Sequence, residues 1–472
     1  MSTSDFRPAA DVVEEALAAG PGGDDRIVVV EDADEVELRF AANTTTTNGS
    51  RRTRRVTVVA VHWSGDGRAG VGVARRSGDV DCDELASAAE REAVSASPAG
   101  DAAPLLTPDE AWAPGSADRA FDDPPGQGDL SMLSDVLAGL SAALGRARSG
   151  SSVLAGFAEH RLTTTTLGTS TGVRLAHAQP EGSLQMVDRD RDGGASAWVG
   201  SATRDFTDLS VEALEDQLAR RRSWAETRIE RPAGRYEVLL PPSAVADLMI
   251  GLAYGSGGQD AEDGRSAFSR AGGGTRVGER LATLPFDLRT DPAEPGLECA
   301  PFVVATASSA DESVFDNGLP SERTHWIADG RLARLRYHRA GAARAGVEPA
   351  AGPDNLILEV PGADATLEEM IAGTERGLLL TCLWYLREVD PATMLLTGLT
   401  RDGVYAVEDG VVVGAVNNFR FNESPVDLLA RATGVGASVG ALGREFGEYL
   451  SRTRMPPVRI PDFNMSSVSP AT

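Results

Sequence analysis

Apolar and polar residues alternate in many short stretches of the first half of the chain, as they do in half-buried β-strands. These stretches follow one another across short polar turns, which favours an antiparallel meander over parallel βαβ units. Apolar residues spaced three or four apart predict helices, and a stretch rich in Pro and Gly at 97–127 predicts a surface excursion. We expect strands at 26–32, 35–42, 55–62, 69–74, 160–167, 172–178, 183–187 and 195–201, and helices at 11–19, 82–94, 133–144 and 211–218.

The second half mixes strand and helix patterns in the same way, after a charged segment at 220–234. We place a domain boundary there, which gives an N-terminal domain at 1–230 and a C-terminal domain at 231–472. Expected strands lie at 236–240, 302–307, 332–337, 355–360, 377–386, 403–408 and 410–416, and expected helices at 243–252, from 366, at 426–432 and at 441–452. The predicted fold class is α+β, with two domains of mostly antiparallel sheet flanked by helices.

Composition narrows the functional classes. The chain has 472 residues and a net charge of −25, which opposes binding to nucleic acid or to an anionic membrane surface. All 45 basic residues are arginine, so a Schiff-base lysine, a Ser–Lys dyad and a phosphate-loop lysine are excluded. The three cysteines are far apart and form no CxxC pair. No signal peptide is visible, and the longest apolar run, 377–386, is too short to span a bilayer, so we expect a cytoplasmic protein.

Three familiar motifs fail on their context. The run 188–193 begins like a calcium loop, but its twelfth position is Val199, so we expect a polar hairpin turn. The glycines at 273–278 have phosphate-loop spacing, yet Glu279 and Arg280 follow them in place of Lys and Ser or Thr. The GxSxG at 436–440 follows a predicted helix and no His lies after it, so a small-residue link between helices is expected.

Histidine provides no obvious metal site. The five histidines (His62, His160, His177, His325 and His338) form no HExxH pattern and no pair at helical ligand spacing. His325 and His338 flank a Gly turn and could face each other, with Asp311 and Asp316 as nearby acids. These four residues carry the alternative of a stand-alone hydrolase.

The order of motifs in the C-terminal half resembles the TldD/PmbA family, whose members TldD and TldE (PmbA) pair as a cytoplasmic peptidase. The resemblance rests on 361–381 (PGADATLEEMIAGTERGLLLT), 397–421 (TGLTRDGVYAVEDGVVVGAVNNFRF) and 454–463 (RMPPVRIPDF), with weaker likeness at 265–282 and 68–78. TldD-type members carry HExxxH on the helix after the strand that opens the second domain. The corresponding helix here, 243–254, has neither His nor Glu, and no Cys or His follows Cys382.

The resemblance therefore implies the TldE type: an accessory subunit with no cofactor of its own, whose TldD-like partner holds zinc and acts on peptides or unfolded segments. A third alternative is a homodimeric peptide-binding protein without catalysis. Amide and guanidinium groups suit main-chain recognition, and aromatic rings suit an apolar cavity. The candidate peptide contacts are Asn417, Asn418, Phe419, Arg420, Phe421 and Asn422.

Overall fold

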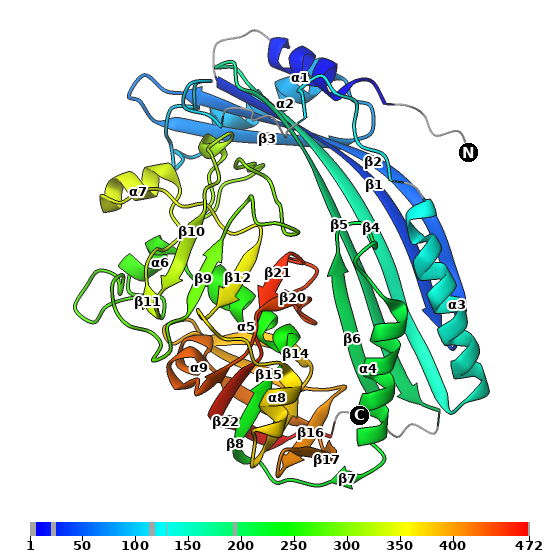
Figure 1. Cartoon of the computed structure of the whole chain (residues 1–472). Coiled ribbons are helices and arrows are strands. Elements are labelled where there is room, and N and C mark those ends of the chain that lie inside the picture. The colour runs from blue at the N-terminus through cyan, green and yellow to red at the C-terminus, as the bar shows by residue number, and fades with distance from the viewer. Residues whose placement is uncertain (1–5, 20–24, 113–118, 129, 192–195, 471–472) are drawn as a thin grey trace.

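The computed structural model describes residues 6–19, 25–112, 119–128, 130–191 and 196–470. A curved sheet of long strands from the first half arches over a body built from the second half (Figure 1). The body contains two further sheets, one of six and one of ten strands among the described residues. Most strand pairs are antiparallel, which confirms the predicted α+β class.

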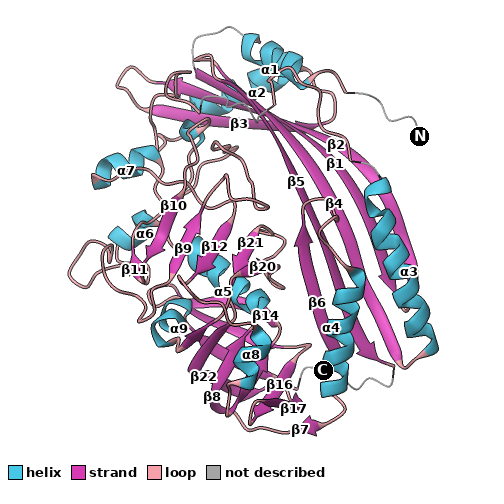
Figure 2. Cartoon of the chain, in the orientation of Figure 1, coloured by secondary structure: helices cyan, strands magenta, loops and turns pink. Residues whose placement is uncertain are grey.

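The curved sheet has the order β3-β2-β1-β4-β5-β6 and is antiparallel throughout. Figure 2 shows α1 and α2 at one end of it and α3 and α4 at the other. Its strands are β1 (Asp25–Ala41), β2 (Thr44–Trp63), β3 (Ala69–Ser77), β4 (Ser152–Thr169), β5 (Arg174–Asp190) and β6 (Ser196–Thr203). Its helices are α1 (Ala9–Ala18), α2 (Cys82–Ser95), the 3-10 turn η1 (Leu130–Leu133), α3 (Ser134–Ser149) and α4 (Val211–Trp224).

The two faces of the curved sheet differ, because side chains alternate along each strand. On β1, Val28, Val30, Val36 and Leu38 all pack under the helices. The residues between them face the other way: Ile27 and Val29 pack against the body near Phe315, whereas the far end of that face carries charged residues. The sheet is thus joined to the body by an apolar contact at one end and by polar groups at the other.

Two predicted breaks in the curved sheet are wrong, since 26–32 and 35–42 form one strand, and so do 172–178 and 183–187. Asp32 interrupts the apolar pattern of β1 without ending it, because its carboxylate pairs with the buried guanidinium of Arg54. Pro180 lies opposite Leu162 in β5. Proline has no backbone N–H to donate, and this is tolerated because β6 pairs with β5 only from Gly182 onward.

The larger body sheet has the order β14-β15-β18-β22-β8-β13-β16-β17-β7, with β19 paired to β22, and the smaller has the order β11-β10-β9-β12-β21-β20. The larger comprises β7 (Arg228–Ile229), β8 (Gly234–Leu240), β13 (Arg376–Leu380), β14 (Leu383–Asp390), β15 (Leu395–Thr400), β16 (Val404–Glu408), β17 (Val411–Val416), β18 (Phe419–Glu423), β19 (Gly434–Val435) and β22 (Val458–Val468). The smaller comprises β9 (Asp287–Thr290), β10 (Thr324–Ala328), β11 (Arg331–Leu332), β12 (Leu356–Glu359), β20 (Val439–Ala441) and β21 (Thr453–Met455). The body helices are α5 (Pro242–Tyr254), α6 (Gly258–Glu262), the 3-10 turn η2 (Val314–Asp316), α7 (Arg339–Ala345), α8 (Leu367–Ala372) and α9 (Pro425–Arg431). The boundary proposed near residue 230 falls between α4 and β8, although β7 just before it already pairs with β17.

Three predictions in the body are wrong. The stretch 302–307 is not a strand, because the side chain of Asn317 takes the backbone N–H and carbonyl of Ala305 at 2.8 and 2.7 Å, in place of a strand neighbour. Within 332–337 only Leu332 belongs to a strand, β11. The run 377–386 splits into β13 and β14 at 381–382, because β13 pairs with β16 and β14 pairs with β15.

The predicted helix at 441–452 is also absent, and the reason lies outside the segment. The backbone N–H groups of 444–446 donate to a carboxylate on α5 instead of to carbonyls of their own turn. Among the described helices, none combines the length and the apolar character needed to cross a membrane.

Candidate functional site

The helix α5 opens with Pro242 in its first turn, where the missing N–H costs nothing, and continues as a nearly uniform apolar run. Nine of its thirteen residues are buried, and one of those nine is charged. That residue, Asp247, has no exposed surface. It lies on the helix where the family resemblance would place metal ligands.

Asp247 is hydrogen-bonded to the backbone of the segment between β20 and β21. Its Oδ1 accepts the N–H groups of Glu445 at 3.0 Å and Phe446 at 2.8 Å, and its Oδ2 accepts that of Arg444 at 2.9 Å. A Cβ on Gly443 would lie only 2.5 Å from Oδ1, so glycine is required for this approach. Burial raises the pKa of Asp247 to about 7, against the opposing pull of the three backbone donors.

The surroundings of Asp247 contain further polar and aromatic side chains from β6, β14 and the segments beside them. The guanidinium of Arg444 lies 3.9 Å from the ring centroid of Trp384 and 5.6 Å from that of Trp198 on β6. Burial raises the pKa of Cys382 far above its usual value, so this thiol is not a nucleophile at neutral pH. The arrangement binds α5 to the curved sheet through Trp198.

The residues of this region do not fit a catalytic metal. Zinc needs at least three protein donors in reach, usually His, Cys or carboxylate. The only such donor on α5 is Asp247, and both of its oxygens are already occupied by backbone N–H groups. Across the described ranges, no group of three or more His, Cys, Asp or Glu side chains is placed to hold a metal ion.

A cavity of about 530 Å³ lies where the ends of β5 and β6 meet β16 and β17. It is lined by Arg189, Arg401, Tyr405, Asn417 and Asn418, among others. Asn417 Oδ1 accepts the N–H of Arg231 at 2.7 Å, while its buried Nδ2 has no partner among the described residues. This amide N–H₂ has almost no exposed surface, so it can donate to an acceptor in the cavity only after the side chain rotates.

The other four predicted contacts lie elsewhere. Phe419 and Phe421 are fully buried and pack against Tyr236 and Phe463, so they are not accessible to a ligand. Arg420 is exposed and donates to Thr397. Asn422 lines a separate shallow hollow beside α9. Strand alternation separates the predicted cluster, and a contact role for Asn417 and Asn418 remains a prediction.

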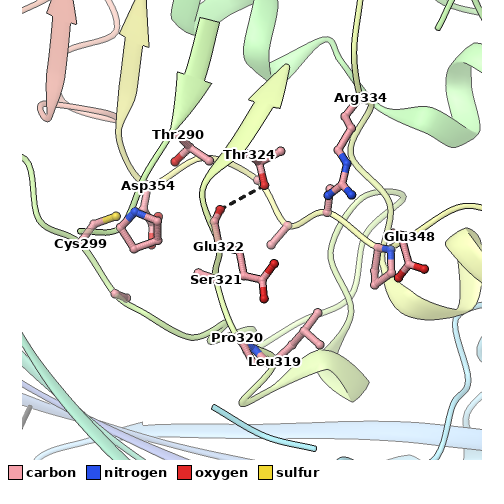
Figure 3. Close-up of a pocket in the computed structure, with 16 residues that line it drawn as sticks. Thr290, Cys299, Leu319, Pro320, Ser321, Glu322, Thr324, Arg334, Glu348 and Asp354 are labelled. Carbon is pink, nitrogen blue, oxygen red and sulfur yellow. Dashed lines mark hydrogen bonds between the residues drawn. The ribbon is translucent and has the colours of Figure 1, made fainter. Parts of the chain in front are cut away.

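A second cavity, of about 350 Å³, lies at the end of β9 and β10 (Figure 3). Thr324 Oγ1 donates to the carbonyl of Glu322 in its wall. Burial raises the pKa of Cys299 to about 12, which makes this thiol unreactive at neutral pH. The wall of this cavity also contains exposed carboxylates and Arg334. Among these described lining residues, no nucleophile is in contact with a base.

Three of the four residues of the stand-alone hydrolase alternative have structural contacts. His338 Nδ1 accepts the N–H of Gly341 and caps α7. Asp311 pairs with Arg336 at 2.8 Å, and Asp316 pairs with Arg339 at 2.9 Å, while both acids also lie near enough to His338 to interact with its charge. The fourth residue, His325, lies on β10 opposite Arg289.

The structure also shows where the calcium-loop-like, phosphate-loop-like and GxSxG stretches lie. The calcium-like run ends within 192–195, outside the described residues. The glycines of 272–278 form a loop with positive φ at Gly272, Gly273, Gly274 and Gly278. In the GxSxG stretch, Ser438 Oγ donates to Leu358 O at 2.8 Å and is followed by β20, so the predicted link between two helices is wrong.

Comparison with known proteins gives a consistent result. Residues 233–467 match the PmbA/TldA metallopeptidase C-terminal domain. TldE from Thermococcus kodakarensis is similar in structure, with a TM-score of 0.77 and 16% identity over 97% of this chain and 99% of that one. A putative modulator of a DNA gyrase from Thermotoga maritima has a TM-score of 0.76 and 17% identity over 96% and 99%, and one from Bacteroides thetaiotaomicron has 0.73 and 16% over 98% and 98%. No curated protein matches the chain.

Proposed function

Since the chain belongs to the TldD/PmbA family, we propose that it is a TldE-like accessory subunit of a cytoplasmic metallopeptidase. It would pair with a TldD-like catalytic subunit that holds the metal. Together the two subunits would process or degrade peptides.

The observation that carries this proposal is the state of α5. Where a metal site is expected, the helix carries one carboxylate, and the oxygens of that carboxylate already accept three backbone hydrogen bonds. A hydrolase that activates water needs an open coordination position or an unencumbered base. Neither is present around Asp247, so catalysis is assigned to the partner.

A reconstitution experiment tests the proposal. The purified chain, the TldD-like protein of the same organism and their mixture would each be assayed on an unfolded protein substrate, with and without a chelator. We expect the two proteins to co-elute, and chelator-sensitive cleavage in the mixture to exceed that of either protein alone. Chelator-sensitive cleavage by this chain alone, or no association and no gain on mixing, would contradict the proposal.

A further inference from the structure

Aromatic side chains gather on the surface above the Asp247 contact. Tyr449 is 72% exposed and Tyr385 is 49% exposed. Phe446, partly exposed, lies with its ring centroid 6.3 Å from that of Tyr449, and Trp384 lies 5.9 Å from Tyr385. We call Tyr385, Phe446 and Tyr449 the aromatic surface. Large exposed aromatic rings in close proximity are typical of binding surfaces.

The backbone under Tyr385 is strained in a way that keeps its ring exposed. Its φ is +51°, which is unfavourable for a bulky aromatic residue. Strain of this kind persists where neighbours fix it, and it is concentrated at functional positions. Here Glu445 fixes it: Oε2 accepts the N–H of Tyr385 and Oε1 pairs with Arg387, each at 3.0 Å.

The aromatic surface is supported from below by Asp247. The same carboxylate that accepts the N–H of Glu445 also accepts that of Phe446. The segment carrying Glu445, Phe446 and Tyr449 is therefore fixed to α5, and Glu445 in turn fixes Tyr385 on β14. Because Asp247 and Glu445 already hold these residues in place, the aromatic surface loses little conformational entropy when it binds a ligand.

Acidic side chains lie beside the aromatic surface, and one of them, Glu37, is paired with Arg39. Because Leu38 and Ala158 pack under the helices, Glu37 on β1 and Glu159 on β4 project from the opposite face, toward the body. Desolvation raises the pKa of Glu159, and the carboxylates of Glu448 and Glu37 raise it further. Glu448 adjoins Tyr449, so Glu159 and Glu448 lie beside the aromatic surface, whereas Glu37 is paired with Arg39 and Arg161 lies near Glu159 (Figure 1 shows β14 and β20 on the side of the body nearest the curved sheet).

We propose that the aromatic surface and the carboxylates of Glu159 and Glu448 bind an extended peptide that carries apolar or aromatic residues next to cationic ones. This inference rests on the proposed function and names the class of peptide that this subunit recognises. Charge selects the occupant: a second copy of the chain, with net charge −25, would be repelled, whereas a cationic peptide would be attracted.

Strand addition is not the mode of binding. Although β14 is at the edge of its sheet, its register shifts between Trp384 and Arg387 and again between Glu388 and Asp390. Such irregularities disfavour pairing of another strand along an edge. The peptide is recognised by side chains: its apolar groups stack on Tyr385 and Tyr449, and its cations face the carboxylates.

Fluorescence anisotropy with the full chain and labelled decapeptides tests this. The probes alternate Arg with Phe, Arg with Ser, or Glu with Phe. We expect the Arg–Phe probe to bind tightest, and both Tyr449→Ser and Glu159→Gln to weaken it, the former by about tenfold. Val411→Ser, at another exposed apolar position, and Glu84→Gln, on α2, serve as controls and leave binding unchanged.

Several outcomes would overturn the inference. They are equal binding of the three probes, unchanged binding by Tyr449→Ser, or light scattering that shows copies of the chain joined through Tyr449. Tyr385→Gly relieves the positive φ and keeps the fold, so weakened binding by this variant at unchanged thermal stability supports the surface. If the peptide does not bind but the chain associates with a TldD-like subunit, the inference is wrong and the proposed function stands. If the peptide binds but the chain does not associate with a TldD-like subunit, only the proposed function is wrong.

Discussion

The guanidinium of Arg54 on β2 lies against the carboxylate of Asp32 on β1, with Nη2 2.6 Å from Oδ2 and Nε 2.7 Å from Oδ1. The two side chains are only 1% and 2% exposed. Arg54 also donates to the carbonyl of Arg7, which ties the chain before α1 to the sheet. A bidentate pair of this kind stabilises the pairing of β1 with β2 at the point where a polar residue interrupts the apolar pattern of β1.

Removing one member of this pair should be costly. Arg54→Met leaves a buried carboxylate without its cation, and we expect a loss of about 3–5 kcal/mol in the free energy of unfolding. Chemical denaturation measures it. Arg51→Met, which breaks an exposed pair with Glu35, should cost less than about 1 kcal/mol. If Arg54→Met combined with Asp32→Leu does not recover most of the loss, an unpaired charge is not its cause.

Asp247 should make stability depend on pH. Its pKa is raised from 3.8 in the unfolded chain to about 7 in the folded one, so the folded state binds this proton more tightly. The resulting stabilisation is complete below about pH 4 and is lost as the pH rises through about 7. We expect the free energy of unfolding to fall more steeply between about pH 4 and 7 in the wild type than in Asp247→Asn. The exposed Asp364→Asn should keep the wild-type slope, and equal slopes in all three proteins would contradict the assignment.

The isolated chain should not depend on zinc. With both oxygens of Asp247 engaged, α5 offers no vacant ligand, so a chelator should leave the thermal midpoint unchanged. Elemental analysis of the purified chain should find zinc far below one ion per chain. Stoichiometric zinc, together with a midpoint lowered by the chelator, would show that a site exists.

The amide of Asn417 can be tested with a change of a single group. Asn417→Asp keeps the oxygen that accepts the N–H of Arg231 and replaces the buried amide N–H₂ of this cavity-lining residue. We expect weaker peptide binding at an unchanged thermal midpoint, since a lost hydrogen bond costs about 0.5–1.5 kcal/mol. Asn422→Asp, in the separate hollow, is the control. Equal affinities of both variants and the wild type would remove Asn417 from the list of contacts.

Sequence periodicity predicted the fold class and most elements, because the long strands and helices each bury one face. It failed where backbone groups are satisfied from elsewhere in the chain. The helix expected at 441–452 is prevented by Asp247, which lies almost two hundred positions earlier, and Asn317 plays the same part at Ala305. Side-chain acceptors that replace a turn or a strand neighbour leave no local pattern.

The candidate site was predictable only in part. The absence of His and Glu from α5 was visible in the sequence, but the role of its one charged residue was not. A lone carboxylate in an otherwise apolar helix is a usable signal, since a buried charge needs several partners. For Asn417 to Asn422, strand alternation should have placed Phe419 and Phe421 on the face opposite Arg420 and Asn422. It could not place Asn417 and Asn418, which precede β18.

The contact between Asp247 and Gly443 bears on how readily α5 could acquire a metal ligand. A histidine at position 247 would supply such a ligand, yet it would leave three backbone N–H groups in the protein interior without acceptors and would collide with the segment at Gly443. The change would require the segment 443–446 to be rebuilt at the same time. Single substitutions toward a metal site on α5 therefore lead through less stable intermediates.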